Sequence, residues 1–170
     1  MDKFNLDIEI VKMTIKSLKS NTSCGVRGVP AELLKSGTER LYELLRQIFE
    51  SCLNGDENPN DWKIGHISVI HKKGKMDEYE NYRGITVFNI FSRVYGKITK
   101  HFLEQEYSQI KTAEQAGFRA GRSTIDHIFC LRQLIEKNMA VNQPLHLLFV
   151  DLEKAYDGVP LKNLWKVLEH

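Results

Sequence analysis

Hydrophobic side chains recur at helical spacing along much of the chain. In residues 7–19 they stand three or four positions apart, and Asp7 precedes them where a capping residue belongs, so a helix is predicted there. The same spacing predicts longer helices that begin at Thr38 and at about Asn89. The side chains expected to be buried are Leu41, Leu44, Leu45, Ile48 and Cys52 in the first of these and Ile90, Phe91, Val94, Ile98 and Phe102 in the second.

Shorter helices are predicted after two prolines and one serine. Pro30 suits the first helical position of residues 30–36, because the N–H that proline lacks is not needed there. Ser123 can cap a helix that carries apolar residues as far as Leu134, and Pro160 opens a last helical stretch. The polar residues 56–61 are the only stretch with the composition of an internal linker, and no repeat is present.

Two other stretches have the pattern of β-strands. The β-branched residues around Ile67–Ile70 predict one strand, and Lys72-Lys73-Gly74 predicts a tight turn at its tip. Residues 145–150 are apolar at five of six positions, which predicts a short strand buried on both faces. Together with the helices, these strands predict an α+β fold.

Composition is that of a soluble globular domain, with 42% hydrophobic and 27% charged residues in a chain of 170. No apolar run approaches the roughly 20 residues that span a bilayer, and the first residues do not resemble a signal peptide. An intracellular protein, nuclear or cytoplasmic, with no membrane contact is therefore expected. The three cysteines are far apart and the six histidines form no His-x-x-x-His pair, so neither a disulfide framework nor a zinc site is indicated.

Positive charge is concentrated in the middle of the chain. Residues 62–124 contain 11 Lys and Arg against 6 Asp and Glu, a net charge of +5, so the remaining residues sum to −3 within the total of +2. A basic surface of this kind can bind a phosphate backbone, but a merely solvated face would show the same pattern. Charge alone leaves both interpretations open.

Asp151 follows the second predicted strand directly. A carboxylate in this place is costly to desolvate unless a cation or hydrogen-bond donors meet it. It could cap the turn that follows by accepting from backbone N–H groups, or it could have a metal or phosphate role. A P-loop nucleotide site is excluded, because neither Gly74-Lys75 nor Gly96-Lys97 stands in the required Gly-x-x-x-x-Gly-Lys-Ser/Thr pattern.

The residues around Asp151 favour the metal role. The stretch Phe149-Val-Asp-Leu-Glu-Lys-Ala-Tyr-Asp-Gly-Val-Pro160 resembles the first catalytic motif of reverse transcriptases from non-LTR retrotransposons. The resemblance implies that Asp151 is a catalytic residue that binds Mg²⁺, with Mn²⁺ as an alternative ion, and that the backbone carbonyl of Leu152 adds a ligand. It also implies that Tyr156 excludes a ribose 2′-hydroxyl. Hard oxygen ligands suit these ions.

Two further motifs resemble the same family and follow its order. The first runs from Pro59-Asn-Asp-Trp62 through the lysine turn to Asn81-Tyr-Arg-Gly-Ile85, and it implies that Lys72, Lys73 and Arg83 bind the incoming dNTP or the template. The second, Gln115-Ala-Gly-Phe-Arg-Ala-Gly-Arg-Ser-Thr124, implies a phosphate contact by Arg119.

The resemblance implies a helix-rich α+β fold: a partial right-hand polymerase with a fingers hairpin and one buried palm strand. The expected parts are a helical extension of the fingers at 1–57, the fingers at 58–144 and the start of the palm at 145–170. The implied activity is RNA-directed DNA polymerisation, in which dNTPs are added by two-metal catalysis to the 3′-hydroxyl of a DNA primer on an RNA template.

The alternative function is that of a non-catalytic nucleic-acid-binding remnant of such a polymerase. A second acidic motif, usually Tyr-x-Asp-Asp, would discriminate the two, and no Asp-Asp pair occurs in the chain. One carboxylate does not offset the repulsion between two Mg²⁺ ions. The chain made alone is therefore expected not to synthesise DNA.

Overall fold

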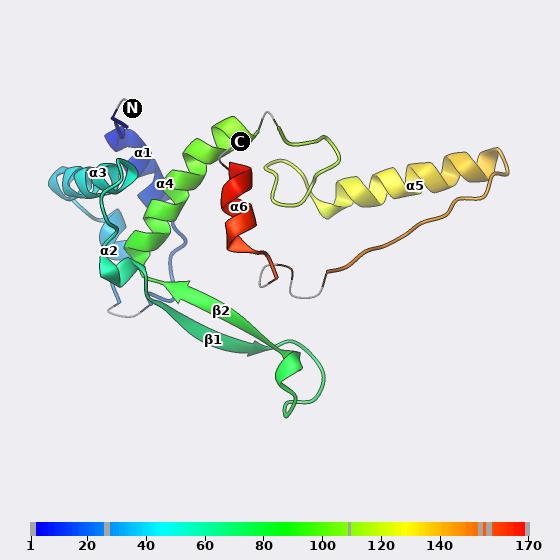
Figure 1. The fold of residues 1–170 in the computed structure, drawn as a ribbon, viewed down its shortest axis with the longest axis horizontal. Coiled ribbons are helices and arrows are strands. Elements are labelled where there is room, and N and C mark those ends of the chain that lie inside the picture. Colours follow the sequence, from blue (N-terminus) through cyan, green and yellow to red (C-terminus); the bar gives the residue numbers. More distant parts are fainter. Residues whose placement is uncertain (1–2, 26–27, 109, 153–154, 156–157, 169–170) are drawn as a thin grey trace. The chain divides into compact units, whose positions relative to one another are not determined.

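The structure is a computed structural model that describes residues 3–25, 28–108, 110–152, 155 and 158–168. Its α-helices and strands, drawn in Figure 1, are α1 (Ile8–Lys16), α2 (Ala31–Lys35), α3 (Glu39–Leu53), β1 (Gly65–His71), β2 (Tyr82–Phe88), α4 (Ile90–Tyr107), α5 (Thr124–Ala140) and α6 (Leu161–Leu168). The chain divides into two compact units, Met1–Lys111 and Thr112–His170. None of the helices that the described residues form is long and apolar enough to cross a membrane.

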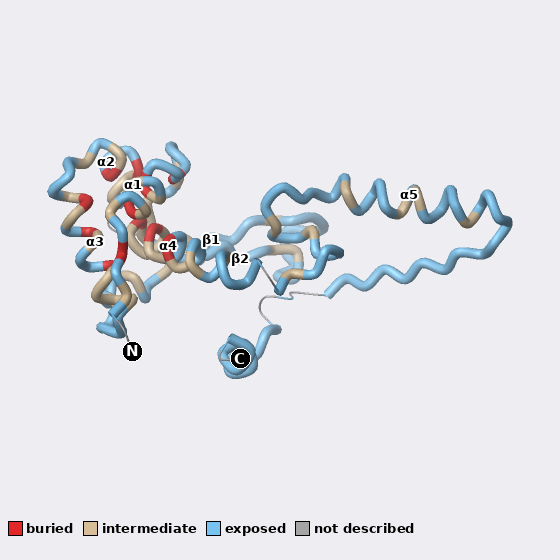
Figure 2. Tube along the Cα trace, turned by 90° about the horizontal axis from the view of Figure 1, so that it is seen from above, coloured by how far each residue is buried: buried red, intermediate tan, exposed pale blue. Residues whose placement is uncertain are grey.

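The hydrophobic core lies in the first unit, where α1 packs against α2, α3 and α4. Figure 2 shows the buried segments on these four helices. The residues that form this core are Leu6, Val11, Ile15, Leu18, Ala31, Leu34, Tyr42, Leu45, Phe49, Ile90, Val94 and Ile98. The phenol of Tyr42 donates to the carbonyls of Leu34 and Lys35 at 3.2 and 3.1 Å, which satisfies a polar group among apolar neighbours.

The helix starts follow from their capping residues. The carboxylate of Asp7 accepts a hydrogen bond from the N–H of Glu9 at 2.9 Å, and the side chain of Asn89 accepts from the N–H of Ser92 at 2.8 Å. Both starts were predicted. Pro30 stands one place earlier than predicted, because it is the N-cap of α2 and not its first helical residue.

The buried face of α3 differs from the prediction. Tyr42, Leu45 and Phe49 are buried, whereas Leu44 and Ile48 are 51% and 43% exposed. The prediction counted aliphatic residues, but two aromatic rings direct this helix toward the core because they bury more apolar area. The ring of Phe49 lies 5.5 Å from that of Trp62 and 6.1 Å from that of Tyr95.

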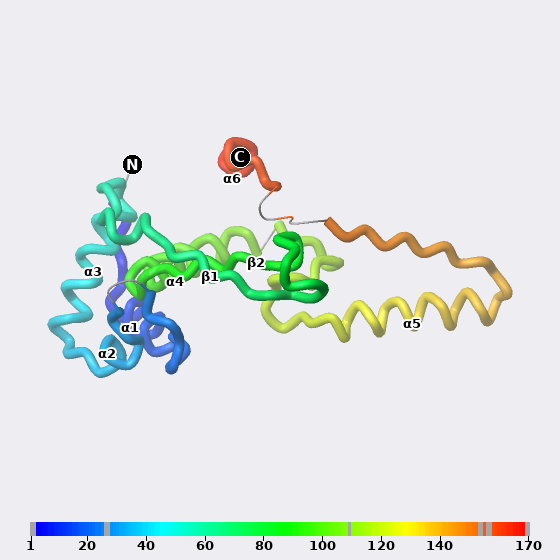
Figure 3. The backbone as a smooth tube through the Cα atoms, turned by 90° about the horizontal axis from the view of Figure 1, so that it is seen from below, coloured from blue at the N-terminus to red at the C-terminus, as the bar shows by residue number. Residues whose placement is uncertain are grey.

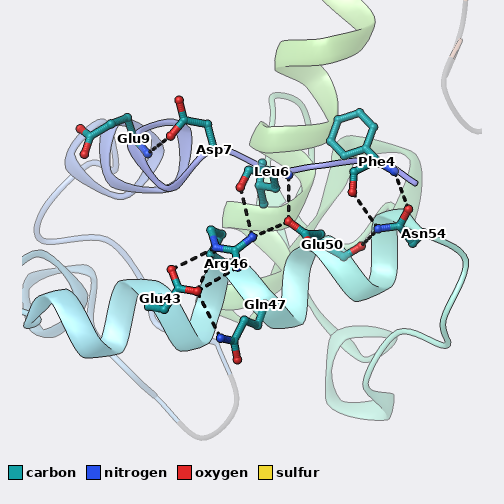
Figure 4. Close-up of polar contacts among 9 residues, drawn as sticks. All are labelled: Phe4, Leu6, Asp7, Glu9, Glu43, Arg46, Gln47, Glu50 and Asn54. Carbon is teal, nitrogen blue, oxygen red and sulfur yellow. Dashed lines mark hydrogen bonds and ion pairs between the residues drawn. The ribbon is translucent and has the colours of Figure 1, made fainter. Parts of the chain in front are cut away.

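A polar cluster on α3 holds the N-terminal segment (Figure 4). The guanidinium of Arg46 bonds to Glu43 and Glu50, and the N–H of Leu6 donates to Glu50 at 2.9 Å. Asn54 closes the end of the helix by accepting from the N–H of Phe4 at 2.7 Å and donating to its carbonyl at 2.9 Å. The hydrogen bond from Arg46 lowers the pKa of Glu43.

Strands β1 and β2 pair antiparallel, in a register that runs from Gly65 opposite Phe88 to His71 opposite Tyr82. The predicted strand around Ile67–Ile70 is confirmed. The predicted tight turn is wrong, because residues 72–81 connect the strands and include a short 3-10 helix at Tyr79–Asn81.

The second unit contains α5 and α6. Ser123 caps α5 as predicted, and Asp126 completes a capping box by accepting from the N–H of Ser123 at 2.6 Å. The predicted buried strand at 145–150 is wrong in this structure, since these residues are exposed and form no strand. A strand needs a neighbour that pairs with its N–H and C=O groups, and the described part of this unit offers no other strand.

Candidate nucleic-acid and metal site

The predicted phosphate-binding residues of the first unit lie at one end of the β-hairpin. Lys72 and Lys73 follow β1 directly, and Arg83 is the second residue of β2, paired across the sheet with Ile70. All three residues are exposed. The structure thus brings them together at the connected end of the two strands, where a guanidinium and two ammonium groups can meet a phosphate.

The connection between the strands has a defined conformation. The N–H of Lys72 donates to the carbonyl of Asn81 at 2.7 Å, and the Asn81 amide donates to the carbonyl of Lys75 at 2.9 Å. Gly74 has a φ of 89°, and a Cβ atom there would lie 2.6 Å from the Asn81 side chain. The phenol of Tyr82 donates to the carbonyl of Met76 at 2.9 Å.

Sequence reasoning missed this role of Asn81 and Tyr82. Both belong to the Asn81-Tyr-Arg-Gly-Ile85 motif, from which only Arg83 was selected, because its charge suggested phosphate binding. Asparagine and glycine are both frequent in turns, so the presence of Gly74 and Asn81 in the stretch after the first strand could have indicated this role. Their hydrogen bonds hold the backbone that carries the two lysines.

Arg119 lies in the loop before α5, in the second unit. Its guanidinium donates from Nη1 to the carbonyl of Thr112 at 2.6 Å, and its side chain is half-buried. One donor is therefore used to hold the loop, and within the described part of the chain the remaining guanidinium donors are available for a phosphate. Arg122 is exposed and lowers the pKa of Asp126, although the hydrogen bond from the N–H of Ser123 is the larger cause of that shift.

Asp151 and Leu152 follow the extended residues 145–150 and are exposed. A carboxylate and a backbone carbonyl are hard oxygen donors of the kind that Mg²⁺ takes, so their chemistry fits the predicted ion. Among the described residues, however, no group of three or more His, Cys, Asp or Glu side chains could hold a metal ion. Two donors alone do not make a metal site. Tyr156 lies outside the described residues, so its assignment stays a prediction.

The site residues divide between the two units. Lys72, Lys73 and Arg83 belong to Met1–Lys111, and Arg119, Asp151 and Leu152 belong to Thr112–His170. Within the first unit, the structure assembles a cationic hairpin end. Within the second, it shows a half-buried arginine and an exposed carboxylate, each in a segment that matches a distinct motif.

Comparison with known proteins agrees with these motifs. A family model described as "Reverse transcriptase (RNA-dependent DNA polymerase)" matches residues 70–170, which is more than half of the chain. The chain belongs to the reverse transcriptase family. The matched range includes the connection after β1, Arg83, the loop of Arg119 and Asp151.

Similar proteins come from transposable elements of Drosophila melanogaster. The chain is 29% identical over 155 residues to "Probable RNA-directed DNA polymerase from transposon BS", a match that covers 89% of the chain and 17% of that protein. It is 30% identical over 115 residues to the corresponding protein of transposon X-element, covering 66% of the chain and 13% of the relative. It is 25% identical over 171 residues to "RNA-directed DNA polymerase from mobile element jockey", covering 92% and 18%.

These relatives confirm the resemblance to reverse transcriptases of non-LTR retrotransposons. The chain spans less than a fifth of the length of each of the three. The activity of the complete polymerases can therefore only be proposed for this chain.

Proposed function

We propose that residues 1–170 form the fingers and the start of the palm of a right-hand RNA-directed DNA polymerase from a non-LTR retrotransposon. The main support for the proposal is the family match over residues 70–170. This range contains the cationic hairpin end, which is formed by Lys72, Lys73 and Arg83, and then Asp151, in the family's order. In this assignment residues 1–57 extend the fingers, residues 58–144 form the fingers, and residues 145–170 begin the palm.

The substrates are an RNA template, a DNA primer and dNTPs. Lys72, Lys73 and Arg83 bind phosphates of the nucleotide or the template, with Arg83 able to bond one phosphate through two donors. Arg119 adds a phosphate contact from its loop. Tyr156 blocks the 2′-hydroxyl of a ribonucleotide, since a ring beside the sugar rejects an extra oxygen by steric exclusion.

Asp151 and the carbonyl of Leu152 are the proposed ligands for magnesium, with manganese as the alternative. When bound, such an ion would supply Lewis-acid stabilisation of phosphoryl transfer to the primer 3′-hydroxyl. The part that this chain contributes is one negative charge and one carbonyl oxygen, placed after an apolar segment. The full two-metal reaction needs further acidic ligands.

A second function is favoured by one observation. Because the described residues offer no group of three or more metal-binding side chains, the chain alone fits a nucleic-acid-binding, non-catalytic role. Both functions place nucleic acid on the cationic hairpin end. They differ in whether DNA synthesis occurs when the second acidic motif is supplied.

Salt dependence of binding tests the assignment of the hairpin. The chain is titrated onto a fluorescent RNA–DNA primer–template at several KCl concentrations, because cations that neutralise phosphates release counterions. Replacement of Lys72 and Lys73 by alanine should flatten the slope of log association constant against log salt by about 1.5, from about 0.7–0.9 per phosphate contact. The matched control replaces the exposed Lys3 and Arg40 by alanine and should keep the slope. Equal slopes in all three proteins would contradict the assignment.

A further inference from the structure

In the first unit, α1 packs against both α2 and α4 (Figure 3). A cluster of cations that includes none of the predicted site residues lies on α4 and on the segments that end α1 and α2. Its centre is Lys97 on α4, which has four other cations as electrostatic neighbours: Arg93, Lys100, Lys19 and Lys35. Arg93, Lys97 and Lys100 are spaced four and three residues apart on α4, so they share one face of the helix over about 10 Å of its length. We name these five residues the α4 cation cluster.

The segment after α1 positions three members of the α4 cation cluster. Lys97 Nζ donates to the hydroxyl of Ser17 at 2.9 Å, and Lys35 Nζ donates to the hydroxyl of Ser20 at 2.9 Å. Arg93 Nη1 donates to the carbonyl of Ser23 at 3.3 Å. Residues Ser17–Ser23 thus hold the cations close together through uncharged acceptors.

No carboxylate of the described residues forms an ion pair with these cations. Among the described residues, the ion pairs involve Lys12, Arg46, Lys111 and Arg132, and none involves the α4 cation cluster. Two acids are near enough to interact, Glu32 beside Lys35 and Glu104 beside Lys100, so the local charge stays strongly positive. Partial burial of the ammonium lowers the pKa of Lys97, and the four neighbouring cations lower it further.

Holding five like charges together is unfavourable unless an anion offsets the repulsion. We propose that the α4 cation cluster binds the phosphate backbone of a nucleic-acid strand, as a second contact surface beyond Lys72, Lys73, Arg83 and Arg119. The linear spacing on α4 suits a partner with regularly repeated charges.

A membrane or an acidic protein fits these observations less well. A membrane-binding helix would show an exposed apolar face beside its cations, but the apolar residues Val94 and Ile98 that neighbour the cations on α4 are buried in the core. An acidic polypeptide has a lower and less regular charge density than a nucleic acid, which carries one charge per about 1.7 Å as a duplex. The inference depends on the proposed function only in taking nucleic acid as the substrate class.

Equilibrium binding of the 170-residue chain to a fluorescent single-stranded RNA tests the inference. One variant combines Arg93→Gln, Lys97→Gln and Lys100→Gln. A second combines Lys19→Gln and Lys100→Gln. Within the described part of the chain the ammonium groups of these two lysines donate no hydrogen bond that holds the fold, in contrast to Arg93 and Lys97, so this variant should fold normally. The matched control combines Lys3→Gln, Arg40→Gln and Lys63→Gln, which removes as many charges as the first variant from exposed positions outside both surfaces.

The slope of log association constant against log salt should become shallower by about 2 in the first variant and by about 1.4 in the second. These values assume about 0.7 for each phosphate contact of a single strand. The control should keep the parent slope. Polyglutamate at equal charge should compete more weakly than unlabelled RNA. Unchanged slopes in both cluster variants would overturn the inference, as would equal competition by polyglutamate, which would assign the surface to acidic protein. If the cluster variants match the parent while Lys72→Ala with Lys73→Ala still flattens the slope, the proposed function stands and only this inference fails.

Discussion

Gly25 is a position where a single methyl group should destabilise the first unit. Its φ is +70°, a left-handed conformation that residues with a Cβ atom rarely adopt. A Cβ atom would also lie 3.0 Å from the carbonyl oxygen of Phe88 and 3.3 Å from the nitrogen of Asn89. Phe88 ends β2 and Asn89 caps α4, so neither backbone atom can move without disturbing the hairpin or the helix.

The expected cost of Gly25→Ala follows from three contributions. The left-handed conformation costs about 1–2 kcal/mol for alanine, and the close backbone contact adds about 1 kcal/mol. The lower entropy of the unfolded chain returns about 0.5–1 kcal/mol. The free energy of unfolding should therefore fall by about 1–2.5 kcal/mol.

Gly96→Ala is the matched control. Gly96 lies within α4, and a Cβ atom there would meet nothing within 4 Å. Alanine is favoured over glycine in a helix by about 1 kcal/mol. The same substitution should thus stabilise the protein at one position and destabilise it at the other.

Urea unfolding followed by tryptophan fluorescence measures both effects. In a Trp165→Phe background the only tryptophan is Trp62, which packs against the core of the first unit with its ring 5.5 Å from those of Phe49 and Tyr95. With a slope of about 1.5 kcal/mol per molar urea, the two midpoints should differ by more than about 1 M. If Gly25→Ala unfolds at the same urea concentration as the parent or a higher one, the reasoning about this loop is wrong.

Two further predictions concern the selection of deoxyribonucleotides over ribonucleotides and the stability of the fold at acid pH. In a polymerase-competent polypeptide that contains these residues, Tyr156→Ala should raise incorporation of ribonucleotides relative to deoxyribonucleotides, and an unchanged ratio in single-nucleotide extension would refute the steric role. The hydrogen bond from Arg46 lowers the pKa of Glu43, so its stabilising effect is present at neutral pH and is lost as the pH falls from the ordinary glutamate value toward the lowered one. Urea unfolding between about pH 6 and about pH 3 should therefore show a smaller loss of stability in Glu43→Gln than in the parent, and parallel curves would contradict this role.

Helices were predictable where a cap and an apolar stripe agree. The start and buried face of α4 were identified correctly from Asn89, Ile90, Val94 and Ile98, because a cap and a helical stripe are local features of the sequence. The face of α3 was misassigned, because the choice between Leu44 and Tyr42 depends on which neighbours supply a pocket, and Trp62 and Tyr95 come from distant parts of the chain.

The site was predictable to a different extent in each unit. The resemblance selected Arg83, Lys72 and Lys73, and the strand pairing places them at one end of the hairpin. The strand at 145–150 was predicted from its apolar residues alone, but pairing depends on a neighbouring strand that the apolar pattern does not report. The α4 cation cluster was not predicted, since Lys19 and Lys35 join the three cations of α4 only through the packing of α1 against α2 and α4.

Primer extension tests the central claim, that this chain carries one catalytic carboxylate of a reverse transcriptase site. The assay uses an RNA template, a DNA primer, dNTPs and Mg²⁺, and compares the 170-residue chain with a longer polypeptide that continues the same residues through a second acidic motif. Both are also made with Asp151→Asn. The longer polypeptide should extend the primer and lose this activity with Asp151→Asn, while the 170-residue chain should not extend it in either form. Extension by the short chain that disappears with Asp151→Asn, or extension by the longer polypeptide that survives Asp151→Asn, would contradict the account.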